Sequence, residues 1–402
     1  MLFRKRNKTM PVSATSRQAI NPYYEDVSEK FGITQVILFL LLLAFVVVSF
    51  LRNMGMITYR NFYYFFKDLN ASAESFDFFH TDAVSYSADK NQSFTLYRQG
   101  IAVAGKQSVT LFSSSGRQTI SEKISYQNPV AVGTGKYLLI YDLGGYQYAL
   151  YNSHTCVWSG TFSRPIRGAD ISDSGSFAVI TDSAEYLSIV EYYSSNFGLR
   201  NRYSYQAYVT DVSINAKGTG LAVLLSNANA GRFATELRLY EPGSDHESAR
   251  RTISESLGLR CSYTSSGKIA VLTESEISFL NSKGELVSQY SFDGETLKFA
   301  DLNRYGAALL LSLQDSQSES DVIICNKNGK LLYHEQSDHL YHSLSLTNKA
   351  LYLLGADGVC KIKTSNGSSE FMELDTARSN IIGLDANRFY LCQPQKAVCY
   401  RF

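Results

Sequence analysis

The sequence predicts an all-β domain that follows one membrane-spanning α-helix near the N-terminus. Three observations predict it: an uncharged apolar run from Ile33 to Leu51, short apolar runs that recur through the rest of the chain, and 28 tyrosines and 23 phenylalanines against 6 prolines. Aromatic residues favour strands. The formal net charge is +1 and there is no extended basic tract, so the sequence lacks the positive surface that nucleic-acid binding requires. The content of 45% hydrophobic residues excludes a disordered chain.

The apolar run, ITQVILFLLLLAFVVVSFL, is long enough to cross a lipid bilayer. At 1.5 Å per residue it spans roughly 28 Å, close to the ~30 Å hydrocarbon core. A cleaved signal peptide is the alternative. Against it, a long leader precedes the run and the following SFLRNMGM offers no small-x-small cleavage site. We therefore expect an uncleaved signal anchor.

Charge around the run predicts its orientation. Residues 1–32 carry six basic and three acidic groups, and excess positive charge stays on the cytoplasmic side of a membrane. The sequence thus predicts a single-pass cell-membrane protein with a cytoplasmic tail (1–32), a transmembrane helix (33–51), a juxtamembrane linker (52–73) and an extracytoplasmic domain (74–402).

The linker is crowded with aromatic side chains. Such rings prefer the headgroup region of a bilayer, which predicts an interfacial belt; a contact surface for another membrane protein is the alternative. The residues concerned are Tyr59, Phe62, Tyr63, Tyr64, Phe65 and Phe66.

The domain beyond residue 74 is built from repeats. Apolar runs such as IAVAG from Ile101, FAVIT from Phe177 and IAVLT from Ile269 recur at a mean spacing of about 41 residues. A turn ending in glycine precedes several of them, and more polar, alternating segments follow. A period of 40 to 45 residues with four strands per unit is typical of a β-propeller blade.

The length of the repeat region predicts the number of blades. From Ser93 to Phe402 there is room for seven full units and a shorter last one, so we expect eight blades, with seven as the alternative. The last unit lacks a fourth strand. The alternating segment ESFDFFHTD (74–82) could supply it, because pairing the first and last segments closes the ring and removes an exposed edge.

The repeats resemble known propellers. The turn Ser172 to Gly175 and the turn Thr264 to Gly267, each followed by an apolar strand, are similar to those of the WD40-like, TolB-like and quinoprotein-like superfamilies. The architecture as a whole resembles membrane-anchored propeller families of unknown function from Clostridia-type Gram-positive bacteria. The Gly-His and Trp-Asp pairs of true WD40 repeats are missing, and Trp158 is the single tryptophan. The resemblance implies a fold and transfers no catalytic residue.

Cysteine and histidine offer two weak candidate sites. A turn centred between Gln395 and Lys396 would place Cys392 opposite Cys399, which predicts a disulfide; two reduced core cysteines are the alternative. Imidazoles can bind a metal, but the cluster falls on a connection between blades, where a solvated connector is the simpler interpretation. Its members are His334, His339 and His342.

Acidic residues near the predicted inner strands are the remaining candidates. Asp170, Asp211 and Asp301 could line a central channel, or could cap turns and accept hydrogen bonds from backbone amides. The sequence contains no catalytic or nucleotide-binding motif, so we expect no cofactor and no catalytic residue.

The sequence therefore favours a non-catalytic interaction module or scaffold that recognises a protein or a cell-envelope polymer. Loops on a rigid scaffold carry recognition, and the insertion at 226–236 is one candidate. A small-ligand-binding or hydrolase/lyase-type propeller with its site in the central channel is the alternative function.

Overall fold

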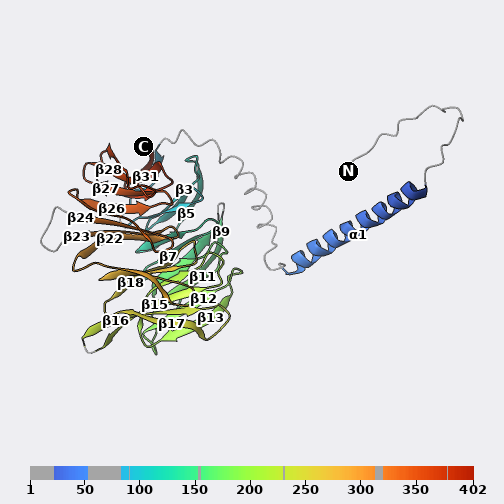
Figure 1. The fold of residues 1–402 in the computed structure, drawn as a ribbon, viewed down its shortest axis with the longest axis horizontal. Helices are drawn as coiled ribbons and strands as arrows, with labels where there is room; N and C mark the ends of the chain where they lie inside the picture. Colours follow the sequence, from blue (N-terminus) through green and yellow to red (C-terminus); the bar gives the residue numbers. More distant parts are fainter. Residues whose placement is uncertain are drawn as a thin grey trace. The chain divides into compact units, whose positions relative to one another are not determined.

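The computed structural model describes residues 22–52, 83–89, 91–152, 155–229, 231–312, 320–377 and 379–402 (Figure 1). The chain divides into two compact units, Met1–Phe65 and Phe66–Phe402. The second unit contains eight four-stranded antiparallel sheets, each a blade of a β-propeller. The expectation of eight blades is confirmed, and the alternative of seven is wrong.

The first unit contains one long helix, α1 (Pro22–Arg52). Its segment Lys30–Val48 is apolar and long enough to cross a membrane, by length and composition, and it is not buried against protein. Thr34 Oγ1 donates to Lys30 O at 2.8 Å within the helix, so this hydroxyl is satisfied locally. The aromatic run from Tyr59 to Phe66 lies outside the described residues.

Each blade is a meander of four consecutive strands, except the last. Blades 1 and 2 comprise β2 (Ser93–Tyr97), β3 (Gly100–Ala104), β4 (Ser108–Phe112), β5 (Gln118–Lys123), β6 (Pro129–Gly133), β7 (Leu138–Asp142), β8 (Gln147–Tyr151) and β9 (Cys156–Thr161). Blades 3 and 4 comprise β10 (Ile166–Ile171), β11 (Phe177–Thr181), β12 (Ser188–Tyr193), β13 (Leu199–Tyr205), β14 (Tyr208–Ile214), β15 (Leu221–Asn229), β16 (Arg232–Tyr240) and β17 (Glu247–Ser254).

The remaining blades follow the same order around the ring. Blades 5 and 6 comprise β18 (Gly258–Tyr263), β19 (Ile269–Thr273), β20 (Glu276–Leu280), β21 (Leu286–Ser291), β22 (Thr296–Asn303), β23 (Gly306–Ser312), β24 (Ser320–Asn326) and β25 (Leu331–Ser337). Blades 7 and 8 comprise β26 (Tyr341–Leu346), β27 (Ala350–Gly355), β28 (Gly358–Lys363), β29 (Ser369–Glu373), β30 (Asn380–Gly383), β31 (Arg388–Cys392), β32 (Lys396–Arg401) and β1 (Val84–Ser85).

The N-terminal strand of the domain closes the ring. Blade 8 has the order β1-β32-β31-β30, and Val84 pairs with Ala397. Tyr86 N then donates to Gln395 O at 3.0 Å. The closure by an N-terminal fourth strand is confirmed, although the described strand is Val84–Ser85, and the segment 74–82 lies outside the described residues.

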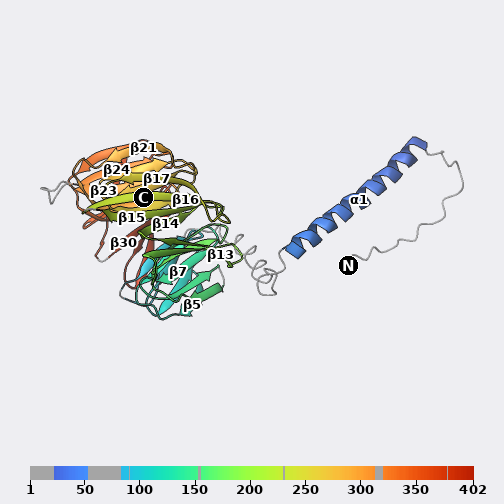
Figure 2. The same cartoon turned by 90° about the horizontal axis from the view of Figure 1, so that it is seen from below.

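Apolar second strands form the core. β3, β7, β11, β19, β23 and β27 are buried along their whole length, whereas fourth strands such as β25 are mostly exposed. Buried clusters join neighbouring blades at every seam; one links blade 8 to blade 1, where β31 lies beside β3 (Figure 1). Figure 2 shows the four strands of blade 4, β14 to β17, from a perpendicular direction. Each buried aliphatic or aromatic side chain contributes about 1.5–3 kcal/mol, so the blades hold one another in place.

The turns between first and second strands form as the sequence predicts. Gly175 N donates to Ser172 O at 3.1 Å, and Gly267 N donates to Thr264 O at 3.0 Å. Both glycines have positive φ, +90° and +77°, which a residue with a Cβ adopts only with strain.

The alternation of strand direction defines two faces of the propeller. We call upper the face that carries the loops between second and third strands and the linkers between blades. The lower face carries the loops between first and second and between third and fourth strands. In blade 8, the third strand β32 runs from the upper to the lower face, so Phe402 ends at the lower face. The fourth strand, β1, runs from the lower to the upper face and therefore begins at the lower face. The described part of the propeller thus begins and ends at its lower face.

Candidate functional site

The acidic residues of the first strands bind neighbouring blades. Asp170 Oδ2 on β10 accepts from Ile214 N at 2.7 Å, and Asp211 Oδ2 on β14 accepts from Cys261 N at 2.9 Å. Asp301 Oδ2 on β22 accepts from Leu346 N at 2.8 Å. Each carboxylate therefore connects its own blade to the first strand of the next. The sequence allowed two interpretations of these residues, as lining of a central channel or as acceptors for backbone amides. The geometry favours the second.

Serine hydroxyls on the first strands make bonds of the same kind, on β14 beside Asp211 and on β26. Ser213 Oγ accepts from Tyr263 N at 3.0 Å, and Ser345 Oγ accepts from Gly383 N at 3.0 Å. At several seams, an Asp or Ser side chain on the first strand of one blade thus accepts a hydrogen bond from the backbone of the first strand of the next blade. Such bonds set the spacing of the blades around the axis.

Burial raises the pKa of the inner carboxyls. The pKa of Asp170 is raised to about 6 by loss of solvent, against which the bond from Ile214 N acts. The pKa of Asp211 is also raised to about 6 by burial, and the Arg260 guanidinium on β18 opposes that rise. Burial raises the pKa of Asp301 as well. In the described part of the chain, no three His, Cys, Asp or Glu side chains are grouped so that they could hold a metal ion.

The three histidines named from the sequence have separate surroundings. His334 on β25 contacts Asp321 Oδ2 through Nε2 at 3.0 Å, and Tyr290 OH lies 3.0 Å from its Nδ1. His339 stacks on Phe371 with ring centroids 6.1 Å apart. His342 on β26 has its pKa lowered by burial. The sequence could not indicate Asp321 and Tyr290 as partners because they come from other strands.

The two cysteines of the last hairpin do not face each other. Cys392 pairs with Ala397 and Tyr390 pairs with Cys399, so the turn is centred one residue earlier than predicted. All six cysteines are free thiols. The predicted register is therefore wrong, and the disulfide that depended on it does not form in this structure.

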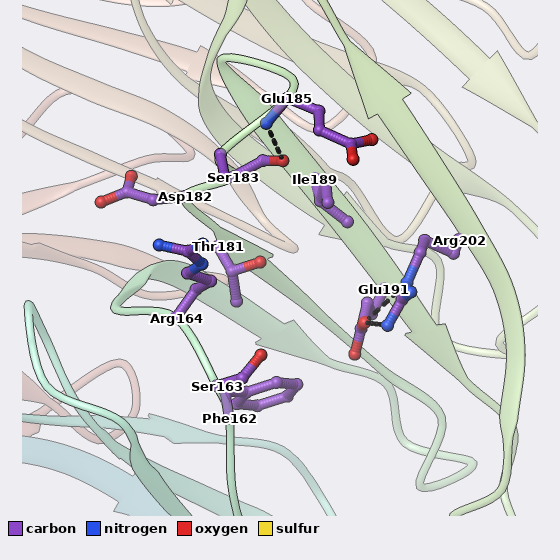
Figure 3. Close-up of a pocket in the computed structure, with 11 residues that line it drawn as sticks. Phe162, Ser163, Arg164, Thr181, Asp182, Ser183, Glu185, Ile189, Glu191 and Arg202 are labelled. Carbon is purple, nitrogen blue, oxygen red and sulfur yellow. Dashed lines mark hydrogen bonds and ion pairs between the residues drawn. The ribbon is translucent and has the colours of Figure 1, made fainter.

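A cavity of about 230 Å³ lies on blade 3, at the upper face (Figure 3). The linker between β9 and β10 forms one wall through Phe162, Ser163 and Arg164. The loop after β11, residues 181–185, forms the opposite wall. Ile189 and Glu191 of β12 and Arg202 of β13 complete the lining. These residues carry no sequence motif, so the sequence did not point to them.

Most charges around the cavity are paired within the protein. Arg202 Nε donates to Glu191 Oε1 at 2.8 Å, and Tyr193 OH donates to Glu191 Oε2 at 2.7 Å. Arg167, beside the cavity, binds both oxygens of Asp182 at 2.6–3.0 Å. Each of these carboxylates is thereby held in one orientation. The first pair joins the neighbouring strands β12 and β13, and the second fixes the loop after β11 to β10.

Arg164 differs from its neighbours. Its guanidinium has no ion pair or hydrogen bond with any residue that the structure describes, and it is exposed at the cavity wall (Figure 3). Glu185 also lacks a side-chain partner in the described ranges, and it lies on the other side of the cavity. The cavity therefore offers one cation whose donors are all available.

Exposed apolar side chains also lie on the upper face of blades 2 to 4. We call them the upper-face patch: Leu143 and Tyr146 from blade 2, Tyr186 and Leu187 from blade 3, and Tyr208 from blade 4, with 38% to 62% of each exposed. Single exposed apolar residues are ordinary, but a group on adjoining loops is typical of an interaction site.

Backbone hydrogen bonds join the loops that carry the patch. Phe162 N donates to Tyr146 O at 2.8 Å, Asp182 N to Pro165 O at 3.3 Å, and Leu187 N to Tyr205 O at 3.0 Å. The loops of blades 2 and 3 and the linkers beside them thus form one continuous surface. Its side chains are presented by a rigid frame.

Solved structures share this fold at low sequence identity. BamB from Moraxella catarrhalis has a TM-score of 0.54 and 14% identity, over 80% of this chain and 99% of that one. The C-terminal WD40 domain of Sif2 has a TM-score of 0.57 and 7% identity, over 80% and 98%. Chaetomium thermophilum Sqt1, bound to the N-terminus of ribosomal protein L10, has a TM-score of 0.53 and 10% identity, over 80% and 100%.

Sequence comparison gives the family. No curated protein matches the chain. A family model described as a family of unknown function, DUF5711, matches residues 78–400, which include every described strand of the propeller except the last residue of β32. Since this match spans most of the chain, the protein belongs to the DUF5711 family.

Proposed function

We propose that the protein is a membrane-anchored interaction module whose upper face binds a protein partner outside the cytoplasm. The upper-face patch is the observation that carries this proposal. Five exposed Leu and Tyr side chains lie on adjoining loops of blades 2 to 4. Tyrosine combines a large apolar area with few rotatable bonds, which suits it to recognition.

The position of the first described strand supports this assignment. β1, the first described strand of the propeller, begins at the lower face, whereas the patch lies on the upper face. An anchor in the bilayer would confine the propeller to the membrane surface. That confinement raises the effective concentration of a partner, and a modest affinity would then suffice.

The charge distribution and the helix support the membrane arrangement. α1 contains the apolar segment Lys30–Val48, and the basic residues of the chain before it favour a cytoplasmic N-terminus. A propeller of the same fold, Sqt1, holds the N-terminus of a ribosomal protein in its solved complex. Such binding is therefore compatible with the architecture.

Photocrosslinking in intact membranes tests the proposed function. A photoreactive amino acid is placed at Tyr208 or Tyr146 in the full-length chain, with Tyr305 on the lower face as the control; Tyr305 is 37% exposed. We expect discrete protein adducts from Tyr208 and Tyr146 and none of the same size from Tyr305. A lack of adducts at the upper face, or equal adducts at both faces, would refute the proposal.

Protease access tests the membrane arrangement separately. Added protease should digest a tag placed after Phe402 in cells whose outer layers have been removed but whose membrane is intact. A tag at the N-terminus should stay protected until the membrane is permeabilised. The reverse pattern would contradict the proposed orientation.

A further inference from the structure

The cavity on blade 3 is richer in available hydrogen-bond donors than in available acceptors. Arg164 presents a whole guanidinium without a partner among the described residues. Arg202 binds Glu191 through Nε and Nη2, and its Nη1 has no hydrogen bond with any residue that the structure describes. A guanidinium carries five N–H donors and no acceptor.

The acceptors of the same cavity are largely occupied. Glu191 has one oxygen bound to Arg202 and the other to Tyr193. Asp182 has both oxygens bound to Arg167. Only Glu185 remains, and in Figure 3 its carboxylate points away from the side on which Arg164 lies. A ligand group beside Arg164 would therefore meet positive charge.

The loop beside the cavity is held in a fixed turn and continues into exposed apolar residues. Glu185 N and Tyr186 N both lie 3.2 Å from Ser183 Oγ, which holds the loop after β11 in a tight turn. Tyr186 and Leu187 follow directly and are 38% and 41% exposed. A ligand that reached Arg164 would have apolar contacts at its side.

We propose that the cavity receives an Asp or Glu side chain of the protein partner, with the carboxylate bound by Arg164 and the flanking apolar residues packed on Tyr186 and Leu187. This inference rests on the proposed function and adds the chemistry that the partner must present. Arginine and carboxylate match in a bidentate geometry, and such charge-assisted bonds are about twice as strong as neutral ones.

The strength of this contact depends on how well the partner excludes water. An exposed ion pair contributes little, whereas a pair enclosed by apolar contacts contributes more. In the proposed complex, the apolar residues of the partner that pack on Tyr186 and Leu187 would supply this enclosure. Reversal of the charge at Arg164 should then reduce binding about tenfold or more, because repulsion is added to the lost bonds.

The test uses the full-length chain in its own membrane, with a photoreactive amino acid at Tyr146 beside the cavity. Adduct yield is compared for the wild type, Arg164→Glu, Arg164→Lys and the control Arg304→Glu. Arg304 lies on the lower face, where its guanidinium forms a 3.7 Å ion pair with Asp173. Mass spectrometry of the crosslinked peptides then identifies the partner segment.

We expect Arg164→Glu to lower the adduct yield about tenfold or more, Arg164→Lys to lower it less, and Arg304→Glu to leave it unchanged. The crosslinked segment should contain an Asp or Glu with apolar neighbours. Replacement of that acidic residue by Arg should restore the adduct with Arg164→Glu. Arg164 is exposed and without a described partner, so its variants should keep the wild-type unfolding midpoint.

The outcomes separate this inference from the proposed function. If the wild type gives adducts but Arg164→Glu gives the same yield, the interaction surface stands and the acidic contact is wrong. A crosslinked segment without an acidic residue, or an adduct with lipid, also overturns the inference. If the wild type gives no adduct at the upper face, both proposals fail.

Discussion

Two tyrosines on one strand allow a matched test of hydrogen bonding in the core. Tyr203 and Tyr205 lie on β13, point to the same side and are both buried in the cluster between blades 3 and 4. Tyr203 OH donates to Ser244 O at 3.0 Å. Among the described residues, the Tyr205 hydroxyl is the one buried side-chain polar atom without a hydrogen-bond partner.

The same substitution should therefore have opposite effects at the two positions. Tyr203→Phe removes a bond that contributes about 1 kcal/mol net, since Ser244 O keeps a second donor, Asn201 Nδ2 at 3.3 Å. Tyr205→Phe removes a buried hydroxyl whose unmet hydrogen bonding costs about 1–3 kcal/mol, so the variant should gain about 1 kcal/mol. The two variants should thus differ by about 2 kcal/mol.

Urea unfolding of the full-length chain in detergent measures this difference. Trp158 is the single tryptophan, and its ring lies 5.8 Å from Phe197 of blade 3, so its fluorescence reports on the seam beside β13. The midpoint should fall for Tyr203→Phe and rise for Tyr205→Phe. Equal losses in both variants would refute the reasoning, because they would mean that the Tyr205 hydroxyl is bonded.

Three further predictions concern ionisation, a buried lysine and the thiols. Burial raises the pKa of Asp170 to about 6, so the wild type should lose stability as the pH rises from about 4 through 6, and Asp170→Asn should flatten that part of the unfolding curve; equal slopes would contradict this. Lys361 Nζ lies 2.6 Å from Glu370 Oε2 and 4.5 Å from the ring centre of Phe402. Lys361→Met should therefore lower the free energy of unfolding by about 1 kcal/mol and speed amide hydrogen exchange in β32. Unchanged exchange in β32 would contradict the idea that Lys361 holds the C-terminus in place. Alkylation of the urea-unfolded protein without reductant should add six groups, one for each free cysteine, and fewer additions in the mass spectrum would reveal a disulfide.

The blades could be predicted from the sequence because they rest on local patterns. One repeat contains the strand that begins at Phe177, the glycine turn before it and the more polar strands after it. Pairing between adjacent strands of a hairpin is determined by the few residues around the turn. Ring closure could also be inferred, since the last unit visibly lacked a strand. The segment predicted to close the ring, 74–82, lies outside the described residues, and the described closing strand is Val84–Ser85.

The last hairpin shows the limit of such inference. A shift of its turn by one residue moves Cys399 from Cys392 to Tyr390, and the sequence CQPQKAVC does not specify where the turn is centred. Both registers keep apolar residues near the core. A disulfide expectation that depends on a single residue of register is accordingly fragile.

The candidate site was harder still to predict because it joins distant loops. Tyr146 and Tyr186 belong to different blades, and only the ring places their loops side by side. Arg164 stands in a linker without a motif. The nearby carboxylates of Asp182 and Glu191 are already bound to Arg167 and Arg202, and only the folded strands bring those pairs together. Exposure and charge pairing are three-dimensional properties that no repeat pattern records.

The closure of the ring has a consequence for how the protein is made. Val84 is among the first residues of the domain to leave the ribosome, yet its partner Ala397 follows 313 residues later. At about 5–20 residues per second, roughly 15–60 s pass before the two can meet. Blades 1 to 7 can form in order during that time, but the edge of blade 1 that faces blade 8 stays uncovered until synthesis is almost complete. A nascent chain that stalls near its end would therefore expose the apolar surface of Ile101 and Val103, and would be a natural substrate for quality control.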